Sequence, residues 1–137
     1  MFSNFNQLTV KDGESFAPPN YGGPLAVKYN TVAYTNTTAK SLFTLPKGAI
    51  IIAWITNVGT AFNSSGTDLL DIGDTATGAR FANDIDVSST GQKLTGYVVS
   101  ELNSPLTEDT VITATYAQSV ADASAGAAVV ACIYMLQ

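Results

Sequence analysis

Short segments rich in β-branched and aromatic residues recur along the chain between turn signals, and none keeps a helical period over about eleven residues. The stretches VITATY (111–116) and AVKYNTVAY (26–34) alternate their side chains with a period of two, as half-buried strands do. This recurrence predicts an all-β fold, either a sandwich or a barrel. The strands expected from it are residues 26–34, 40–45, 49–58, 68–72, 93–99, 110–116 and 127–136.

Two of these segments are apolar on both faces, AIIIAWI (49–55) and AAVVACIYML (127–136). The triple isoleucine, the paired valines and the absence of helix caps favour strands over buried helices. Such strands are either central in a sandwich or part of a subunit interface. We expect Trp54 to be a buried core residue and Cys132, the single cysteine, to act as a small hydrophobe without an intrachain disulfide.

The links between the strands are short and carry turn chemistry. LPKG (45–48) is expected to form a tight turn, and NSSG (63–66) to form a loop tip. GARFAND (78–84) is expected to make at most one helical turn. SVADASAGAA (119–128) indicates a flexible loop before the last strand.

The first 24 residues differ from the rest, because prolines and paired glycines separate their aromatic residues and prevent a regular helix or central strand. We therefore expect an extended N-terminal arm (1–24), with at most one short strand at 7–11, followed by one β-domain (25–137). The arm either packs back on its own domain or docks on a neighbouring subunit. Its candidate contact residues are Phe2, Phe5, Phe16 and Tyr21.

Composition argues against several functions. The net charge of −5 and the scattered lysines do not suit nucleic acid, which needs several cations on one face. The longest apolar run, 49–55, is far shorter than the ~20 residues of a membrane span, and MFSNFNQ lacks the pattern of a targeting signal. We therefore expect a soluble protein that binds neither nucleic acid nor membrane. With no histidine, the chain lacks the commonest general base, so we expect no enzymatic activity, catalytic residues or cofactor.

Five of the eleven acidic residues crowd into positions 68–86: Asp68, Asp71, Asp74, Asp84 and Asp86. Their spacing does not match a known calcium loop, and hydrolysis by a carboxylate pair would need a sugar-binding aromatic platform that the sequence does not suggest. The interpretation that fits best is structural: the aspartates form turns and face water. We expect Phe81, Ile85 and Val87 to point inward and Arg80 to pair with a nearby aspartate, and we assign no metal site.

A set of ordered motifs runs from about residue 40 to the C-terminus: LPKG (45–48), TAFN (60–63), LDIGD (70–74), RFA (80–82), LTEDT (106–110) and the apolar GAAVVACIYM (126–135). Together they resemble a widespread type of small tailed-bacteriophage virion protein. The resemblance implies an antiparallel β-sandwich, of jelly-roll type, with a structural role. Several proteins of this type are head decoration, or cement, proteins. Residues 1–24 lie outside the resemblance.

The resemblance implies a decoration protein that binds the assembled head and stabilises contacts between major capsid subunits. Its partners would be the major capsid protein and its own copies, as a homotrimer on the outer surface of the capsid, after synthesis in the host cytoplasm. The alternative is a carbohydrate- or receptor-binding module of a head fibre or tail. The sequence leaves the choice between these positions in the virion open.

Overall fold

The computed structural model describes residues 25–95 and 104–136 of the 137-residue chain. The expected arm (1–24), with Phe2, Phe5, Phe16 and Tyr21, lies outside the described residues. No helix in the described part is long and apolar enough to cross a membrane. The strands are β1 (Leu25–Ala33), β2 (Lys40–Leu45), β3 (Ala49–Thr60), β4 (Asp68–Asp74), β5 (Ala82–Asp86), β6 (Gly91–Thr95), β7 (Thr110–Gln118) and β8 (Ala127–Leu136).

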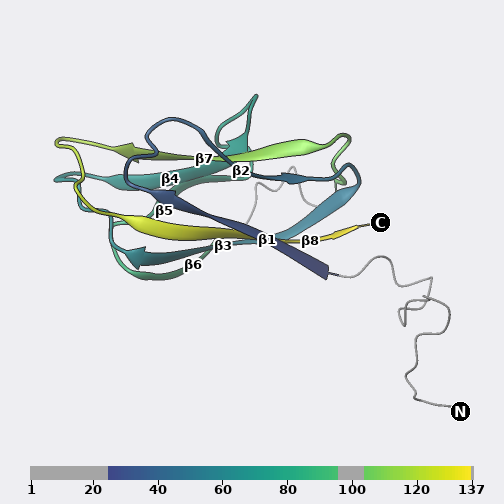
Figure 1. The fold of residues 1–137 in the computed structure, drawn as a ribbon, viewed down its shortest axis with the longest axis horizontal. Coiled ribbons are helices and arrows are strands. Elements are labelled where there is room, and N and C mark those ends of the chain that lie inside the picture. The colour runs from purple at the N-terminus through teal and green to yellow at the C-terminus, as the bar shows by residue number, and fades with distance from the viewer. Residues whose placement is uncertain (1–24, 96–103, 137) are drawn as a thin grey trace, which may run out of the picture.

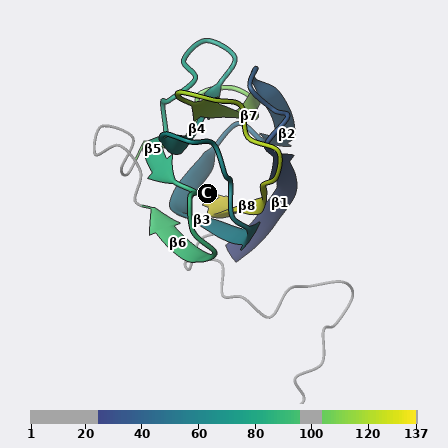
Figure 2. The same cartoon turned by 90° about the vertical axis from the view of Figure 1, so that its left-hand side faces the viewer.

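The strands form two four-stranded antiparallel sheets that pack face to face as a sandwich (Figure 1). One sheet has the order β1-β8-β3-β6 and the other β2-β7-β4-β5, and the view in Figure 2 separates the two layers. The first strand pairs with the eighth, the second with the seventh, the third with the sixth and the fourth with the fifth. This nested pairing is the jelly-roll arrangement, so the fold class expected above is confirmed.

Seven strands coincide with predicted ones to within a few residues, although residues 96–99 of the segment predicted at 93–99 lie outside the described part. The two segments that are apolar on both faces, β3 and β8, are the central strands of their sheet. This confirms the first of the two expectations, a central position in a sandwich. Residues 78–84 contain no helical turn, which agrees with the expectation of at most one. The chain turns at residues 78–79 and enters β5 at Ala82.

β5 was not predicted, because a bulge interrupts the alternation of its inward and outward side chains. In the pairing of β4 with β5, the register shifts between Leu70 and Ile72, and Asp84 adopts a φ of +58°. Aspartate tolerates this left-handed conformation better than most residues. The amide of Asp84 donates to the Asp71 carboxylate at 2.8 Å. A side chain of β4 therefore accepts the hydrogen bond of an amide at the bulge.

The core lies between the sheets and is rich in aromatic rings. Trp54 is fully buried, as expected, with its ring centroid 5.5 Å from that of Phe81 and 6.4 Å from that of Phe43. Phe62 and Tyr116 form a second pair, with centroids 4.7 Å apart. Rings at these distances contribute about 0.5–1.5 kcal/mol per pair beyond the area that they bury.

Cys132 is also buried in the core, and burial raises the pKa of its thiol to about 12. The thiol therefore stays protonated at neutral pH, and the expectation that it acts as a small hydrophobe is confirmed.

At one edge of the sandwich, β1 lies beside β2, and polar side chains join the two sheets. Lys28 donates to the Thr44 carbonyl at 2.6 Å and Asn30 to the Leu42 carbonyl at 2.7 Å. These carbonyls belong to an edge strand, so the side chains satisfy groups that no neighbouring strand pairs. As a consequence, the alternate residues of β1, which include apolar ones, point to the outside of the sandwich.

Two of the connections between strands are fixed by hydrogen bonds to other parts of the chain. In LPKG, Gly48 has a φ of +88° and its amide donates to the Leu106 carbonyl at 2.7 Å, so the expected tight turn is confirmed and tied to the segment before β7. The loop before β8, expected to be flexible, accepts and donates several hydrogen bonds. Its Ser124 and Ala125 amides donate to Asn63 Oδ1 at 2.8 and 2.9 Å.

Candidate interaction surface

The acidic stretch lies on the β4 and β5 side of the sandwich, and its carboxylates bind protein donors. Asp68 is only 3% exposed; its carboxylate accepts the Tyr116 hydroxyl and, at 3.1 Å, the Ser64 amide. Burial and the hydrogen bond to Asp68 raise the pKa of Tyr116 to about 12. This buried pair anchors the loop between β3 and β4 onto β7.

Asp74 closes the loop between β4 and β5. Its carboxylate accepts the amides of Ala76 and Thr77 at 2.9 and 2.7 Å, and forms an ion pair with Arg80 at 2.8 Å. Partial burial raises the pKa of Asp74, but the hydrogen bonds and the charge of Arg80 outweigh it, so the pKa lies below its ordinary value of 3.8. The expected pairing of Arg80 with an aspartate is therefore confirmed.

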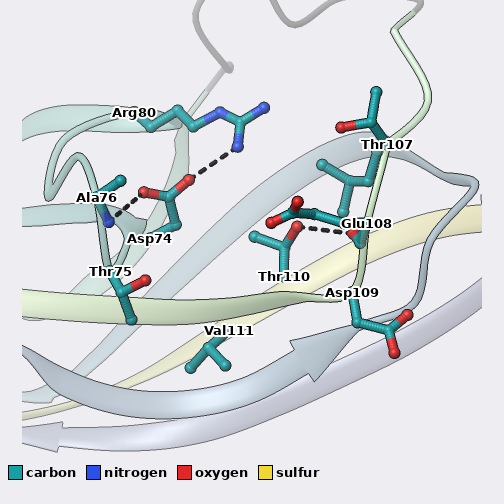
Figure 3. A pocket seen from close by; sticks show the side chains of 10 residues that line it. Asp74, Thr75, Ala76, Arg80, Thr107, Glu108, Asp109, Thr110 and Val111 are labelled. Atoms are coloured by element: carbon teal, nitrogen blue, oxygen red, sulfur yellow. Dashed lines mark hydrogen bonds and ion pairs between the residues drawn. The ribbon is translucent and has the colours of Figure 1, made fainter.

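A polar hollow of about 350 Å³ lies between this loop and the segment that leads into β7 (Figure 3). Asp74 and Arg80 form one wall and Thr107 to Val111 form the other. Asp109 points away from Asp74 and accepts the Lys47 amide at 2.8 Å. A general acid would need a carboxyl pKa raised toward neutrality, whereas the pKa of Asp74 is lowered, so Asp74 is unsuited to that role.

The remaining aspartates also have local partners. The side chain and amide of Ser88 donate to Asp86 and lower the pKa of its carboxyl. Within residues 25–95 and 104–136, no three His, Cys, Asp or Glu side chains gather closely enough to hold a metal ion. Phe81, Ile85 and Val87 are buried, as expected. Asp74 and Asp86 thus hold turns, as expected, whereas Asp68 is buried and does not face water as expected.

The outer side of the sheet β1-β8-β3-β6 is the most distinctive surface of the molecule. A row of side chains crosses all four strands from Tyr29 through Ala131 and Ile55 to Leu94. We call this side the apolar face, and its main side chains are Leu25, Val27, Tyr29, Ile50, Ile52, Ile55, Ala131, Ile133, Met135 and Leu94.

Several of these side chains are far more exposed than apolar residues usually are. Tyr29 is 71% exposed, Leu94 74% and Leu25 66%. None of the described side chains that these four strands direct outward carries a charge. Contiguous apolar patches beyond a few hundred Å² are uncommon on monomers and mark interaction sites. The apolar face therefore has the chemistry of a surface that another molecule covers.

The outer side of the sheet β2-β7-β4-β5 is different. It carries hydroxyl groups, including those of Ser41, Thr44 and Thr115, together with the carboxylates of Asp71 and Asp86. This side can remain in water at little cost, because its polar groups are hydrated or bonded locally. The sandwich thus has one mainly apolar outer side and one mainly polar outer side, although the latter also carries Leu69 and Val111.

The sequence pattern indicates this surface only in part. The segments of β3 and β8 are apolar on both faces, but the pattern of β1 does not show that its apolar residues point outward. Tyr29 is the one exposed aromatic residue in the described ranges, so these residues present no cluster of rings that could serve as a sugar platform.

Comparisons with known proteins show what this fold is similar to. No family model and no curated protein matches the sequence. A chain from the capsid asymmetric unit of cyanophage Pam1 superposes with a TM-score of 0.68 and 23% identity, over 94% of this chain and 98% of that chain.

Two further solved structures have similar chains. One, from the acid-stable capsid of Helicobacter pylori bacteriophage KHP30, has a TM-score of 0.64 and 18% identity over 82% of this chain and 87% of its own. The other, from the capsid of Ralstonia phage GP4, has a TM-score of 0.60 and 15% identity over 90% and 92%. At this identity the likeness establishes the fold. Since the matches cover most of both chains, each matched chain is itself about as short as this one.

Proposed function

We propose that this chain is a structural protein of a tailed-phage capsid, and within it a decoration, or cement, protein. One observation carries the proposal: the whole sandwich is similar to small chains in three phage capsid structures, over at least 82% of this chain and 87% of each of theirs. The ordered motifs from LPKG to GAAVVACIYM supported the same role from sequence alone.

The surface chemistry supports a role in assembly. A cement protein needs a stable domain, a surface for its own copies and a segment that reaches the shell. The jelly roll is the stable domain, and the apolar face is a candidate for the surface that contacts other copies. We assign the third to residues 1–24, whose Phe2, Phe5, Phe16 and Tyr21 are the proposed contacts with the major capsid protein. The protein would sit on the outer surface of the head as a homotrimer.

Capsid binding tests this proposal directly. Expanded capsids that lack the protein are mixed with the purified full-length chain, and the protein that sediments with them is measured. We expect saturable binding by the full-length chain. A variant lacking residues 1–21 should keep its circular dichroism spectrum and lose at least tenfold in affinity. No binding by the full-length chain would refute the capsid role, and full occupancy by the truncated chain would refute the assignment of the arm.

The alternative, a receptor-binding module of a fibre or tail, makes a different prediction. Such a module should bind glycans through exposed rings. Tyr29 is the single exposed aromatic residue of the described part, and it lies among the aliphatic residues Val27, Ile55 and Ala131. Aliphatic neighbours favour protein over sugar as the partner of Tyr29. Binding to a glycan array together with absence of binding to capsids would favour the alternative.

A further inference from the structure

We propose that the apolar face is the surface through which copies of this chain associate with one another. This assignment rests on the proposed function for its setting in a capsid. It adds to that function the side of the sheet through which the copies would associate. The occupant of the apolar face is a neighbouring copy of the chain in the same assembly.

The fold itself gives no reason for the residues of the apolar face to be apolar. The core is already complete between the sheets, where the inward side chains of β3 and β8, such as Trp54, Val130 and Cys132, are fully buried. The outward side chains Tyr29 and Leu94 are 71% and 74% exposed in the single chain. A β-strand needs only one apolar face to pack in a sandwich, so the second apolar face requires a second partner.

The apolar face is close in size to a protein interface. Ten residues of β8 extend about 33 Å, and four strands spaced about 4.8 Å apart give a width of about 19 Å. The face therefore presents on the order of 600 Å², against the about 800 Å² that each partner contributes to a standard protein interface. One sheet side thus supplies most of the area that a stable association of copies needs.

The distribution of charge favours the apolar face over the other outer side as the contact between copies. The chain has a net charge of −5, and its other outer side carries Asp71 and Asp86, so two copies repel one another through that side. The described side chains of the apolar face include no charge, so copies meet there without opposing like charges. A basic or acidic partner would find no complementary charge there. The neutral apolar face therefore fits another copy of the chain better than it fits a charged partner.

The test uses the full-length chain without capsids, so that its failure and the failure of capsid binding are separate results. Sedimentation velocity from 1 to 100 µM measures the mass of the wild type and of the double variant Tyr29→Lys with Leu94→Lys. Both side chains are mostly exposed, so the variant should fold. The control is Ser41→Lys, an exposed position on the opposite sheet.

We expect the wild type and the control to sediment as the same oligomer and the double variant to dissociate at least tenfold more readily, with an unchanged circular dichroism spectrum. If the lysine variant does not fold, Tyr29→Gln with Leu94→Gln replaces it, with a smaller weakening expected. A monomeric wild type throughout the concentration range would overturn the inference, since the face would then be bare or covered by the chain's own arm. An oligomer that neither double variant weakens would overturn it as well.

Discussion

Gly73 lies where the loop between β4 and β5 folds back against the strand that it leaves. A Cβ atom on Gly73 would lie 2.1 Å from the Thr77 carbonyl oxygen and 2.3 Å from the Gly78 carbonyl carbon, both backbone atoms. The next residue, Asp74, holds the same loop through the Ala76 and Thr77 amides. The Gly-Asp pair of the LDIGD motif is therefore required by the loop, and no ligand is needed to explain it.

Substitution of Gly73 by alanine should destabilise the protein, because the added methyl meets backbone that cannot move aside. We expect the free energy of unfolding to fall by roughly 1–3 kcal/mol, the usual cost of overpacking. Gly78→Ala is the matched control: a Cβ there has no atom within 4 Å, and the change should stay within about 0.5 kcal/mol. Urea unfolding measures both, and equal stabilities of the two variants would contradict this account of the loop.

Two buried threonines should respond to valine in opposite directions. Thr56 is fully buried in β3, and its hydroxyl has no hydrogen-bond partner in the structure as described. Thr113 is 2% exposed, and its hydroxyl donates to the Asp74 carbonyl at 3.3 Å. An unpaired buried hydroxyl costs free energy, whereas a paired one contributes about 1 kcal/mol.

Accordingly, Thr56→Val should raise the free energy of unfolding by roughly 1 kcal/mol, and Thr113→Val should lower it by about the same amount. The two substitutions change shape equally little, so each serves as the control for the other. Thermal or urea unfolding gives the sign. A loss of stability in Thr56→Val would mean that its hydroxyl has a partner after all.

Because of the loop between β4 and β5, the free energy of unfolding should fall at acid pH. The folded protein lowers the pKa values of Asp74 and Asp86 below 3.8, the ordinary value. The ionised carboxylates therefore contribute stability that is present above about pH 4, the unfolded pKa, and is lost as the pH falls through the lower folded values.

The variant Asp74→Asn tests this contribution. At pH 7 it should be less stable than the wild type by about 1 kcal/mol or less, since the pair with Arg80 is partly exposed. The difference should shrink as the pH falls toward 2, because the wild-type carboxylate is then protonated as well. Urea unfolding at pH 7, 4 and 2 measures the trend, and a difference that does not change with pH would argue against a charged role for Asp74.

Most strands were predictable because their signals are local. β2 and β8 were predicted with their observed bounds, and β7 was placed by its alternation alone. β5 was missed because it contains a bulge at Asp84, which has a φ of +58°. At the bulge, two residues of β5 lie opposite one residue of β4, so the side chains of β5 no longer alternate with a period of two. A bulge depends on a partner strand, so a single sequence does not reveal it.

The candidate surface was predictable only where a strand is apolar on both sides, as in β3 and β8. In β1, Val27 and Tyr29 alternate with Lys28 and Asn30, and this pattern alone would place the apolar residues inside. The structure reverses it, because Lys28 and Asn30 donate to carbonyls of β2 between the sheets. Alternation shows that two faces differ, but not which of them faces the core.

The whole molecule combines a jelly roll with one mainly apolar and one mainly polar outer side. On the polar side, Asp71 accepts the Asp84 amide of the neighbouring strand and Asp86 accepts the Ser88 hydroxyl, whereas the apolar side leaves Tyr29 and Leu94 exposed until something covers them. A protein that assembles on a large particle needs such a difference, because it must face its neighbours and the solvent at the same time. The similar chains of the three phage capsid structures share this fold.

Electron cryo-microscopy of expanded capsids, before and after addition of the full-length protein, tests the central claim most directly. We expect new density on the outer surface of the head that fits the two four-stranded sheets, with the apolar faces of neighbouring copies turned toward one another. Unchanged capsids, or the sandwich found in a fibre or tail instead of on the shell, would contradict the proposed function.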